Sequence, residues 1–172
     1  MKAVIVGNSG SGKTWLAGQL GRRLGTEIIH FDDLFWEPGG FDKKRTPDEV
    51  SRLVDLSMQT DSWLAEGVFG DLAERYIPVA DCLIWLDIEW PVCERRLRTR
   101  GSESKAHMGR SQTEAGLDKL IDWASNYRTR AGACSFAVHE QLFNGFQKTR
   151  HRLRNEQEVA ELLRAPFLGQ AA

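Results

Sequence analysis

The chain has 172 residues, of which 41% are hydrophobic and 27% charged, and its formal net charge is -1. This length favours one domain with a single core. The composition excludes collagen-like, low-complexity and wholly disordered chains. The longest apolar runs, 3–6 and 82–86, fall far short of the ~18 residues that a membrane span requires. The first run meets a Gly/Ser segment without a signal-peptide pattern, so we expect a cytoplasmic protein with no membrane segment.

The first half of the chain predicts three strands and two helices. A β-branched run at 2–6 predicts a strand buried on both faces, and apolar spacing predicts a helix over 13–24. A strand at 27–31 precedes a predicted loop at 32–44, which has no usable period. Thr46, Pro47 and Glu49 then form a capping box with proline at the first helical position. They open a predicted helix over 47–60, and a third strand follows at 63–66.

The second half continues the alternation. At best a short helix at 71–76 precedes a strand at 81–87, and Pro91 can start a helix that ends at Gly101. The polar segment 101–110 indicates a mobile lid at about 101–128. Ser111 and Glu114 form a capping box before helical spacing to position 124, and an apolar face at 131–142 continues with or without a break. An edge strand at 148–153 and a helix from 156, ended by Pro166, complete the pattern.

Strands that alternate with helices predict an α/β fold. We expect one domain over 1–172 as a three-layer sandwich, with a five-stranded parallel sheet, helices on both faces and a helical lid insertion. Ligands of such folds bind beyond the carboxyl ends of the strands. Gly7, Asp32, Glu66 and Asp87 all follow predicted strands, so we expect them on one rim.

The charge distribution and the cysteine content limit which kinds of ligand or partner the chain can be expected to bind. Residues 1–92 carry 9 Lys/Arg and 15 Asp/Glu, whereas residues 93–154 carry 13 and 6. This asymmetry suggests an anionic ligand or partner; a nucleotide, a nucleic acid and ion pairing between the halves all remain open. Cys82, Cys93 and Cys134 form no C-x-x-C pair, so we expect small buried hydrophobes rather than a metal or disulfide framework.

Residues 7–14 match the phosphate-binding loop (Walker A) pattern G-x-x-x-x-G-K-S/T. The motif follows a predicted buried strand and opens a helix, which lets backbone N–H groups converge on phosphates. We expect Lys13 to reach the β and γ phosphates of ATP and the Thr14 hydroxyl to face Mg²⁺. The alternative is a Gly/Ser turn with an exposed lysine. The predicted nucleotide-binding residues of the loop are Gly7, Asn8, Ser9, Gly10, Ser11, Gly12, Lys13 and Thr14.

A phosphate-binding loop also needs an acidic residue near the metal, and two residues compete for this role. Asp87 is the better simple match to an apolar strand followed by aspartate, but it directly precedes a helix that it could cap. Glu66 follows the third predicted strand. We favour Glu66 as the metal residue and keep Asp87 as the alternative.

With these motifs the chain resembles the small-molecule kinases of the P-loop superfamily, such as adenylate, shikimate and gluconate kinases. The resemblance rests on Glu66-Gly67, on Leu86-Asp87 followed by Arg96 and Arg100, and on a lid-like insertion. The segment 30–39, His-Phe-Asp-Asp-Leu-Phe-Trp-Glu-Pro-Gly, is similar to adenylate-kinase-like bacterial proteins labelled DNA topology modulation proteins. The resemblance spans about residues 1–128, and glutamate stands at position 66 where the family usually has aspartate.

The resemblance implies ATP- and Mg²⁺-dependent phosphoryl transfer to a small molecule, such as a nucleoside or nucleotide. It implies that Arg96 lies on the nucleotide, Arg100 at the lid base and Asp32 at the phosphoryl acceptor. Arg128 flanks the lid helix and is a candidate to close on the phosphates. The alternatives are a solvated basic helix face and a loop carboxylate paired with a nearby cation.

Two further features leave alternatives open. Phe35 and Trp36 could stack on an acceptor ring or could anchor the loop that carries them. Residues 93–154 could form a basic surface of a nucleotide-dependent regulatory or nucleic-acid-binding ATPase. That segment contains no recognisable nucleic-acid motif, and the sequence pI is only 6.4, so we favour the phosphotransferase.

Overall fold

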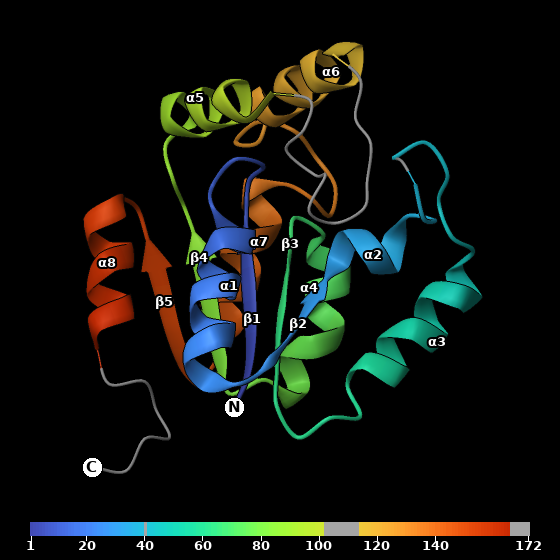
Figure 1. Cartoon of the computed structure of the whole chain (residues 1–172), viewed down its shortest axis with the longest axis vertical. Helices are drawn as coiled ribbons and strands as arrows, with labels where there is room; N and C mark the ends of the chain where they lie inside the picture. Colours follow the sequence, from blue (N-terminus) through green and yellow to red (C-terminus); the bar gives the residue numbers. More distant parts are fainter. Residues whose placement is uncertain (40, 102–113, 166–172) are drawn as a thin grey trace.

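The computed structural model describes residues 1–39, 41–101 and 114–165. Its five strands form one parallel sheet in the order β2-β3-β1-β4-β5 (Figure 1). The strands are β1 (Lys2–Gly7), β2 (Glu27–His30), β3 (Trp63–Gly67), β4 (Cys82–Leu86) and β5 (Thr149–Leu153). The predicted five-stranded parallel sheet is therefore confirmed, with the arginine-rich β5 at an edge. Among the described helices, none is long and apolar enough to cross a bilayer.

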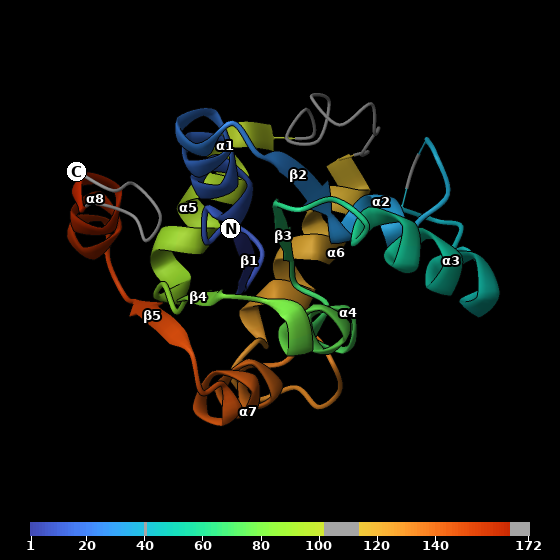
Figure 2. The same ribbon diagram turned by 90° about the horizontal axis from the view of Figure 1, so that it is seen from below.

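Helices cover both faces of the sheet, as the alternation predicted (Figure 2). Val4, Val6 and Trp85 point to one face and pack with α4 and α7, whereas Ile5 and Ile84 point to the other face and pack with α1 and α8. Successive side chains alternate between faces, so a strand with helices on both sides must be apolar throughout. The described helices are α1 (Lys13–Leu24), α2 (Phe31–Phe35), α3 (Pro47–Ser57), α4 (Gly70–Tyr76), α5 (Trp90–Arg100), α6 (Glu114–Ser125), α7 (Phe136–Gly145) and α8 (Glu156–Arg164), with a 3-10 turn at Ile77–Val79.

One sequence expectation was wrong inside the segment 32–44. Residues Phe31–Phe35 form the short helix α2, which buries Phe31 and Leu34. A five-residue helix is too short for its period to be recognised in the sequence. Gly67 makes room for it, because a Cβ at position 67 would lie 2.5 Å from the Cβ of Phe31. The rest of the segment is a loop closed by an antiparallel bridge between Trp36 and Lys44.

The apolar pattern after α6 is interrupted before α7 begins. Ser135 caps α7 by accepting a hydrogen bond from the Val138 N–H, so the face predicted at 131–142 includes a break. The capping box at 111–114 lies largely outside the described residues, as does the part of the expected lid (101–128) that spans 102–113. Of the cysteines, Cys82 and Cys93 are buried as predicted, but Cys134 is only partly buried.

Candidate active site

The phosphate-binding loop lies at the carboxyl edge of the sheet, between β1 and α1. Gly10 has a φ of 78°, and a Cβ there would lie 2.5 Å from the carbonyl oxygen of Cys93, so only glycine fits this turn. Asn8 ties the loop to α6 by donating from Nδ2 to the Ala124 carbonyl at 2.9 Å. The loop is thus held from both α5 and α6, which lie above it in Figure 1.

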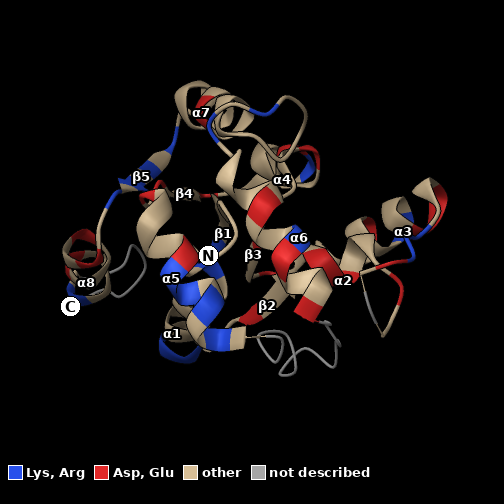
Figure 3. Cartoon of the chain, turned by 90° about the horizontal axis from the view of Figure 1, so that it is seen from above, with Lys and Arg blue, Asp and Glu red and all other residues tan. Residues whose placement is uncertain are grey.

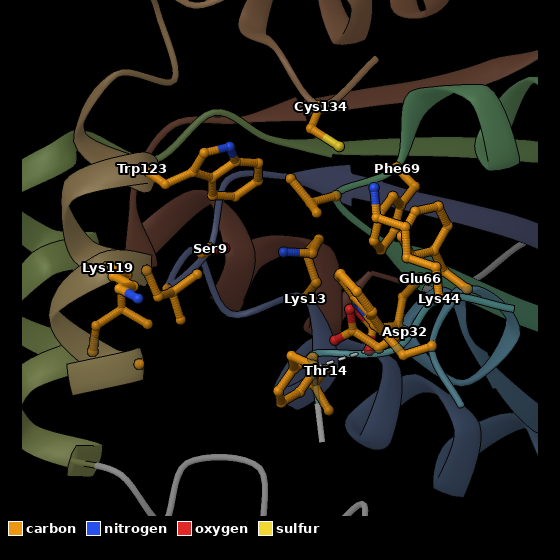
Figure 4. A pocket seen from close by; sticks show the side chains of 18 of the residues that line it. Ser9, Lys13, Thr14, Asp32, Lys44, Glu66, Phe69, Lys119, Trp123 and Cys134 are labelled. Carbon is orange, nitrogen blue, oxygen red and sulfur yellow. Dashed lines mark hydrogen bonds between the residues drawn. The ribbon is translucent and has the colours of Figure 1, made fainter. Parts of the chain in front are cut away.

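Lys13 and the N-terminus of α1 face a large pocket (Figure 4). The Lys13 ammonium donates to the Asn8 carbonyl at 2.9 Å. Gly12 is the N-cap residue of α1, and no side chain there accepts a hydrogen bond from the first amides of the helix. The first turn of α1 also contains no acidic residue. Uncapped amides at a helix N-terminus carry partial positive charge and favour an anion. The pocket has a volume of about 1190 Å³.

Glu66 lies at the end of β3, only 4% exposed, and contacts two neighbouring polar side chains. The Thr14 hydroxyl donates to Glu66 Oε1 at 2.9 Å, and His30 Nδ1 lies 2.7 Å from the same oxygen. His30 and Glu66 are register partners in the β2–β3 ladder. Sequence spacing does not select His30, because it matches no ligand or triad pattern. Only the strand pairing brings it to the site.

Asp87 lies at the end of β4 and is also 4% exposed, but its partners are different. Arg128 donates to Oδ1 at 2.9 Å, and Arg152 donates to Oδ2 at 2.8 Å. Asp87 does not cap α5, whose N-cap residue is Glu89. Two guanidinium groups therefore pair with this carboxylate, whereas Glu66 is the acidic candidate that accepts a hydrogen bond from Thr14 of the phosphate-binding loop.

The three candidate arginines occupy different places. Arg96 donates to the Ser11 carbonyl at 2.9 Å and to Glu156 at 2.8 Å, so it supports the loop from α5. Arg100, one turn further along α5, lines the pocket. Arg128 pairs with Asp87 and Glu89, and its guanidinium lies 4.5 Å from the ring centroid of Phe136. Arg96 and Arg100 are four residues apart on α5, but Arg96 contacts the loop backbone whereas Arg100 lines the pocket.

Asp32 belongs to the first turn of α2 and lines the pocket on the side opposite α6 (Figure 4). The aromatic residues Phe35, Trp36, Phe41 and Phe69 line the same side. Cys134 also lines the pocket, and burial raises the pKa of its thiol to about 11. The thiol is therefore protonated near neutral pH and is a poor nucleophile.

The oxygen donors at the loop fit Mg²⁺. This ion prefers hard oxygen ligands and is usually held by one or two protein groups, water and substrate phosphates rather than by a complete protein cage. The hydroxyl of Thr14 and the carboxylate of Glu66 are 2.9 Å apart beside Lys13 and the amides of α1. This donor set matches a metal shared with a phosphate.

Comparison with solved structures supports the fold. Shikimate kinase from Bacteroides thetaiotaomicron aligns with a TM-score of 0.50 and 15% identity, over 95% of this chain and 94% of that chain. Deoxyadenosine kinase from M. mycoides, with products dCMP and a flexible dCDP bound, aligns with a TM-score of 0.49 and 13% identity, over 95% and 97%. No family model and no curated protein matches the chain. The first likeness establishes a P-loop kinase-like α/β fold.

Proposed function

We propose that this chain is an ATP- and Mg²⁺-dependent phosphotransferase with a small-molecule acceptor. The observation that carries the proposal is the hydrogen bond between Thr14 and Glu66 beside Lys13, at a pocket of about 1190 Å³. Pockets for a single drug-sized ligand occupy roughly 300–1,000 Å³. This pocket therefore has room for the phosphates of a nucleotide and for a second molecule.

The residues of the phosphate-binding loop and its neighbours would have different roles in binding the nucleotide and stabilising charge. Lys13 and the amides at the start of α1 bind the β and γ phosphates, with Arg100 on the neighbouring wall. Thr14 and Glu66 would hold Mg²⁺, which neutralises charge between phosphate oxygens when it is bound. Arg96 fixes the loop carbonyls through Ser11. These contributions suit phosphoryl transfer, where catalysis is mostly positioning and electrostatics.

Asp32 would receive the hydrogen bond or proton of the acceptor hydroxyl. This role is supported by its place on the pocket wall opposite α6. Asp87 serves as an ion-pair partner of Arg152 and Arg128 and not as the metal residue. In this assignment Arg128 reaches the phosphates only by leaving Asp87. The finer resemblance to adenylate-kinase-like proteins rests on the segment 30–39 and does not specify an acceptor.

Calorimetry of ATP binding tests the phosphate-binding loop. Lys13→Ala should weaken ATP binding at least tenfold, about 1.4 kcal/mol, because the mutant loses the cation nearest the phosphates. Lys43→Ala is the matched control, since Lys43 pairs with Glu37 and is mostly exposed. Equal ATP affinity in the Lys13 variant and the wild type would remove the proposal.

The regulatory or nucleic-acid-binding ATPase predicts a different result. In that case no small-molecule acceptor would raise ADP release. Duplex DNA would bind tightly and selectively even as the salt concentration increases. Under our proposal DNA binds only weakly and is lost as salt rises, which is the behaviour of non-specific phosphate contacts.

A further inference from the structure

The pocket has two sides that differ in chemistry, and Lys13 lies between them. Figure 4 shows Lys119 and Trp123 of α6 on one side of Lys13, and Phe69 and Lys44 on the other, with Asp32 nearby. We call the first the loop side, because it continues the phosphate-binding loop towards α5 and α6. We call the second the acceptor side, because it contains Asp32.

The two sides carry opposite charge among the lining residues that the structure describes. The loop side has Arg100 and Lys119 and no carboxylate. The acceptor side has Asp32, Asp42 and Asp71, with Lys44 as its one cation. Figure 3 shows basic residues along α5 and acidic residues on α2, whereas α6 carries residues of both signs, of which Lys119 lines the pocket. Among the described lining residues of this side, carboxylates outnumber the one ammonium, so a second anion there would be repelled at short range.

The acceptor side also presents a wall of aromatic rings. Phe35 stacks on Phe69 with 4.4 Å between ring centroids and meets Trp36 edge to face at 4.9 Å. Phe41 extends the wall, 6.1 Å from the Trp36 ring. Phe69 is buried in the core, but Phe35 and Trp36 are only partly buried and line the pocket. Such a surface favours a flat ring, which gains stacking contacts without needing a charged partner.

Charge and shape together define a substrate class for the proposed phosphotransferase. We propose that its acceptor is an alcohol on a flat ring that carries no negative charge, as in a nucleoside, and not a phosphate or carboxylate. The inference rests on the proposed function and specifies its second substrate. Lys44 does not change this assignment, because its ammonium lies over the Phe35 ring, 5.5 Å from the centroid.

The reaction balances as an ordinary transfer of a phosphoryl group. The acceptor oxygen forms a bond to the γ phosphorus of ATP, and the bond from that phosphorus to the β–γ bridging oxygen breaks. ADP leaves with the electron pair, and the hydroxyl proton passes to Asp32 and then to water. A nucleoside phosphorylated in this way becomes an anion, which the acceptor-side carboxylates repel. The same charges that select the substrate therefore favour release of the product.

Paired ligands test the charge rule directly. Binding of each acceptor is measured by calorimetry on the full chain with Mg²⁺ and a non-hydrolysable ATP analogue, and ADP release is measured with ATP. The probes are adenosine, cytidine and thymidine, their 5′-monophosphates, thiamine as a cationic ring alcohol, and shikimate as a hydroxy acid. We expect at least one uncharged or cationic ring alcohol to bind about tenfold or more tightly than every anion and to raise ADP release.

Two variants test how the aromatic wall and Lys44 contribute to binding of the acceptor. Trp36→Leu should raise the KM of the acceptor by about fivefold, the size of one lost aromatic contact, with the KM of ATP unchanged. Trp15→Leu is the matched control, since Trp15 is 52% exposed on α1 and does not line the pocket. Lys44→Met should change acceptor affinity by less than threefold, because the proposed acceptor carries no anionic group for this lysine to bind.

The outcomes separate this inference from the proposed function. Tighter binding of a monophosphate or of shikimate, a tenfold loss of acceptor affinity in Lys44→Met, or no response to any uncharged or cationic ring alcohol overturns the inference. Each of these results leaves ATP binding and its dependence on Lys13 in place. Failure of the wild type to bind ATP at all counts instead against the proposed function.

Discussion

The Thr14 hydroxyl donates a 2.9 Å hydrogen bond to Glu66 across the gap between α1 and β3. The two residues are 52 positions apart in the chain, and the β1–β3 pairing brings them together by placing Ile5 beside Glu66. The longer glutamate side chain thus reaches the first turn of α1 directly. This contact makes Glu66 the stronger of the two acidic candidates for the metal.

Glu66→Gln should lower Mg²⁺-dependent phosphoryl transfer to any acceptor, water included, by at least tenfold, or ~1.4 kcal/mol of barrier. The amide oxygen can still accept the Thr14 hydrogen bond, but the negative charge that attracts the metal is lost. ADP release at increasing Mg²⁺ measures the effect. A variant with the wild-type rate and the same Mg²⁺ dependence would refute the assignment of Glu66.

Asp32→Asn should affect only transfer to the acceptor. If Asp32 takes the proton of the hydroxyl, acceptor-dependent turnover falls by roughly 10² to 10⁴, while ATP affinity and slow hydrolysis by water stay nearly unchanged. Asp33→Asn is the matched control on the neighbouring position of α2, which does not line the pocket. An equal loss in both variants, or a loss of hydrolysis by water in Asp32→Asn, contradicts the role of Asp32.

Asp87→Asn should reduce stability more than it changes the Mg²⁺ dependence. The carboxylate is buried and paired with Arg152 and Arg128, so its replacement leaves guanidinium charge without compensation. We expect a loss of about 3 kcal/mol, at the lower end for a broken buried pair because Arg128 is half-exposed. Urea denaturation measures the free energy of unfolding. An unchanged midpoint together with a weakened Mg²⁺ response would make Asp87 the metal residue.

Stability should fall as the pH is lowered below about 6.5 because of His139. Burial lowers the pKa of His139 to about 3. Its Nε2 lies 3.0 Å from the Val68 carbonyl, and its Nδ1 lies 2.6 Å from the Tyr127 hydroxyl, which the Trp85 indole already approaches as a donor. Neutral imidazole with its hydrogen on Nε2 satisfies all these contacts, since Tyr127 can then donate to Nδ1.

The direction of this pH dependence follows from the number of protons bound by the folded and unfolded chains. Between pH 6.5 and the lowered pKa, the unfolded chain binds a proton that the folded chain does not, so the free energy of unfolding falls by up to ~1.4 kcal/mol per pH unit as the pH drops. Urea denaturation at pH 7 and pH 5 measures the change. His139→Gln should flatten this slope, and His151→Gln should flatten it less because His151 is only half-buried. An acid slope that persists in His139→Gln would refute the prediction.

The fold was predictable because its signals are local. The glycine pattern at 7–14 requires a turn between a strand and a helix, and buried parallel strands appear as short continuous apolar runs such as 82–86. The capping box at Thr46 was also predictable from the sequence and is present in the structure, with reciprocal hydrogen bonds between Thr46 and Glu49. The short helix α2 was missed, since burial of Phe31 against Gly67 stabilises it and these two residues are far apart in the sequence.

By itself the sequence determined the phosphate-binding loop, the parallel sheet and the rim on which Asp32, Glu66 and Asp87 lie. Only the tertiary structure decided which carboxylate meets Thr14, because that choice depends on strand order and on the arginines that surround Asp87. The pairing of His30 with Glu66 and the opposite charges of the two pocket sides were likewise settled by packing. Side chains distant in the chain acquire their chemistry from the neighbours that the fold gives them.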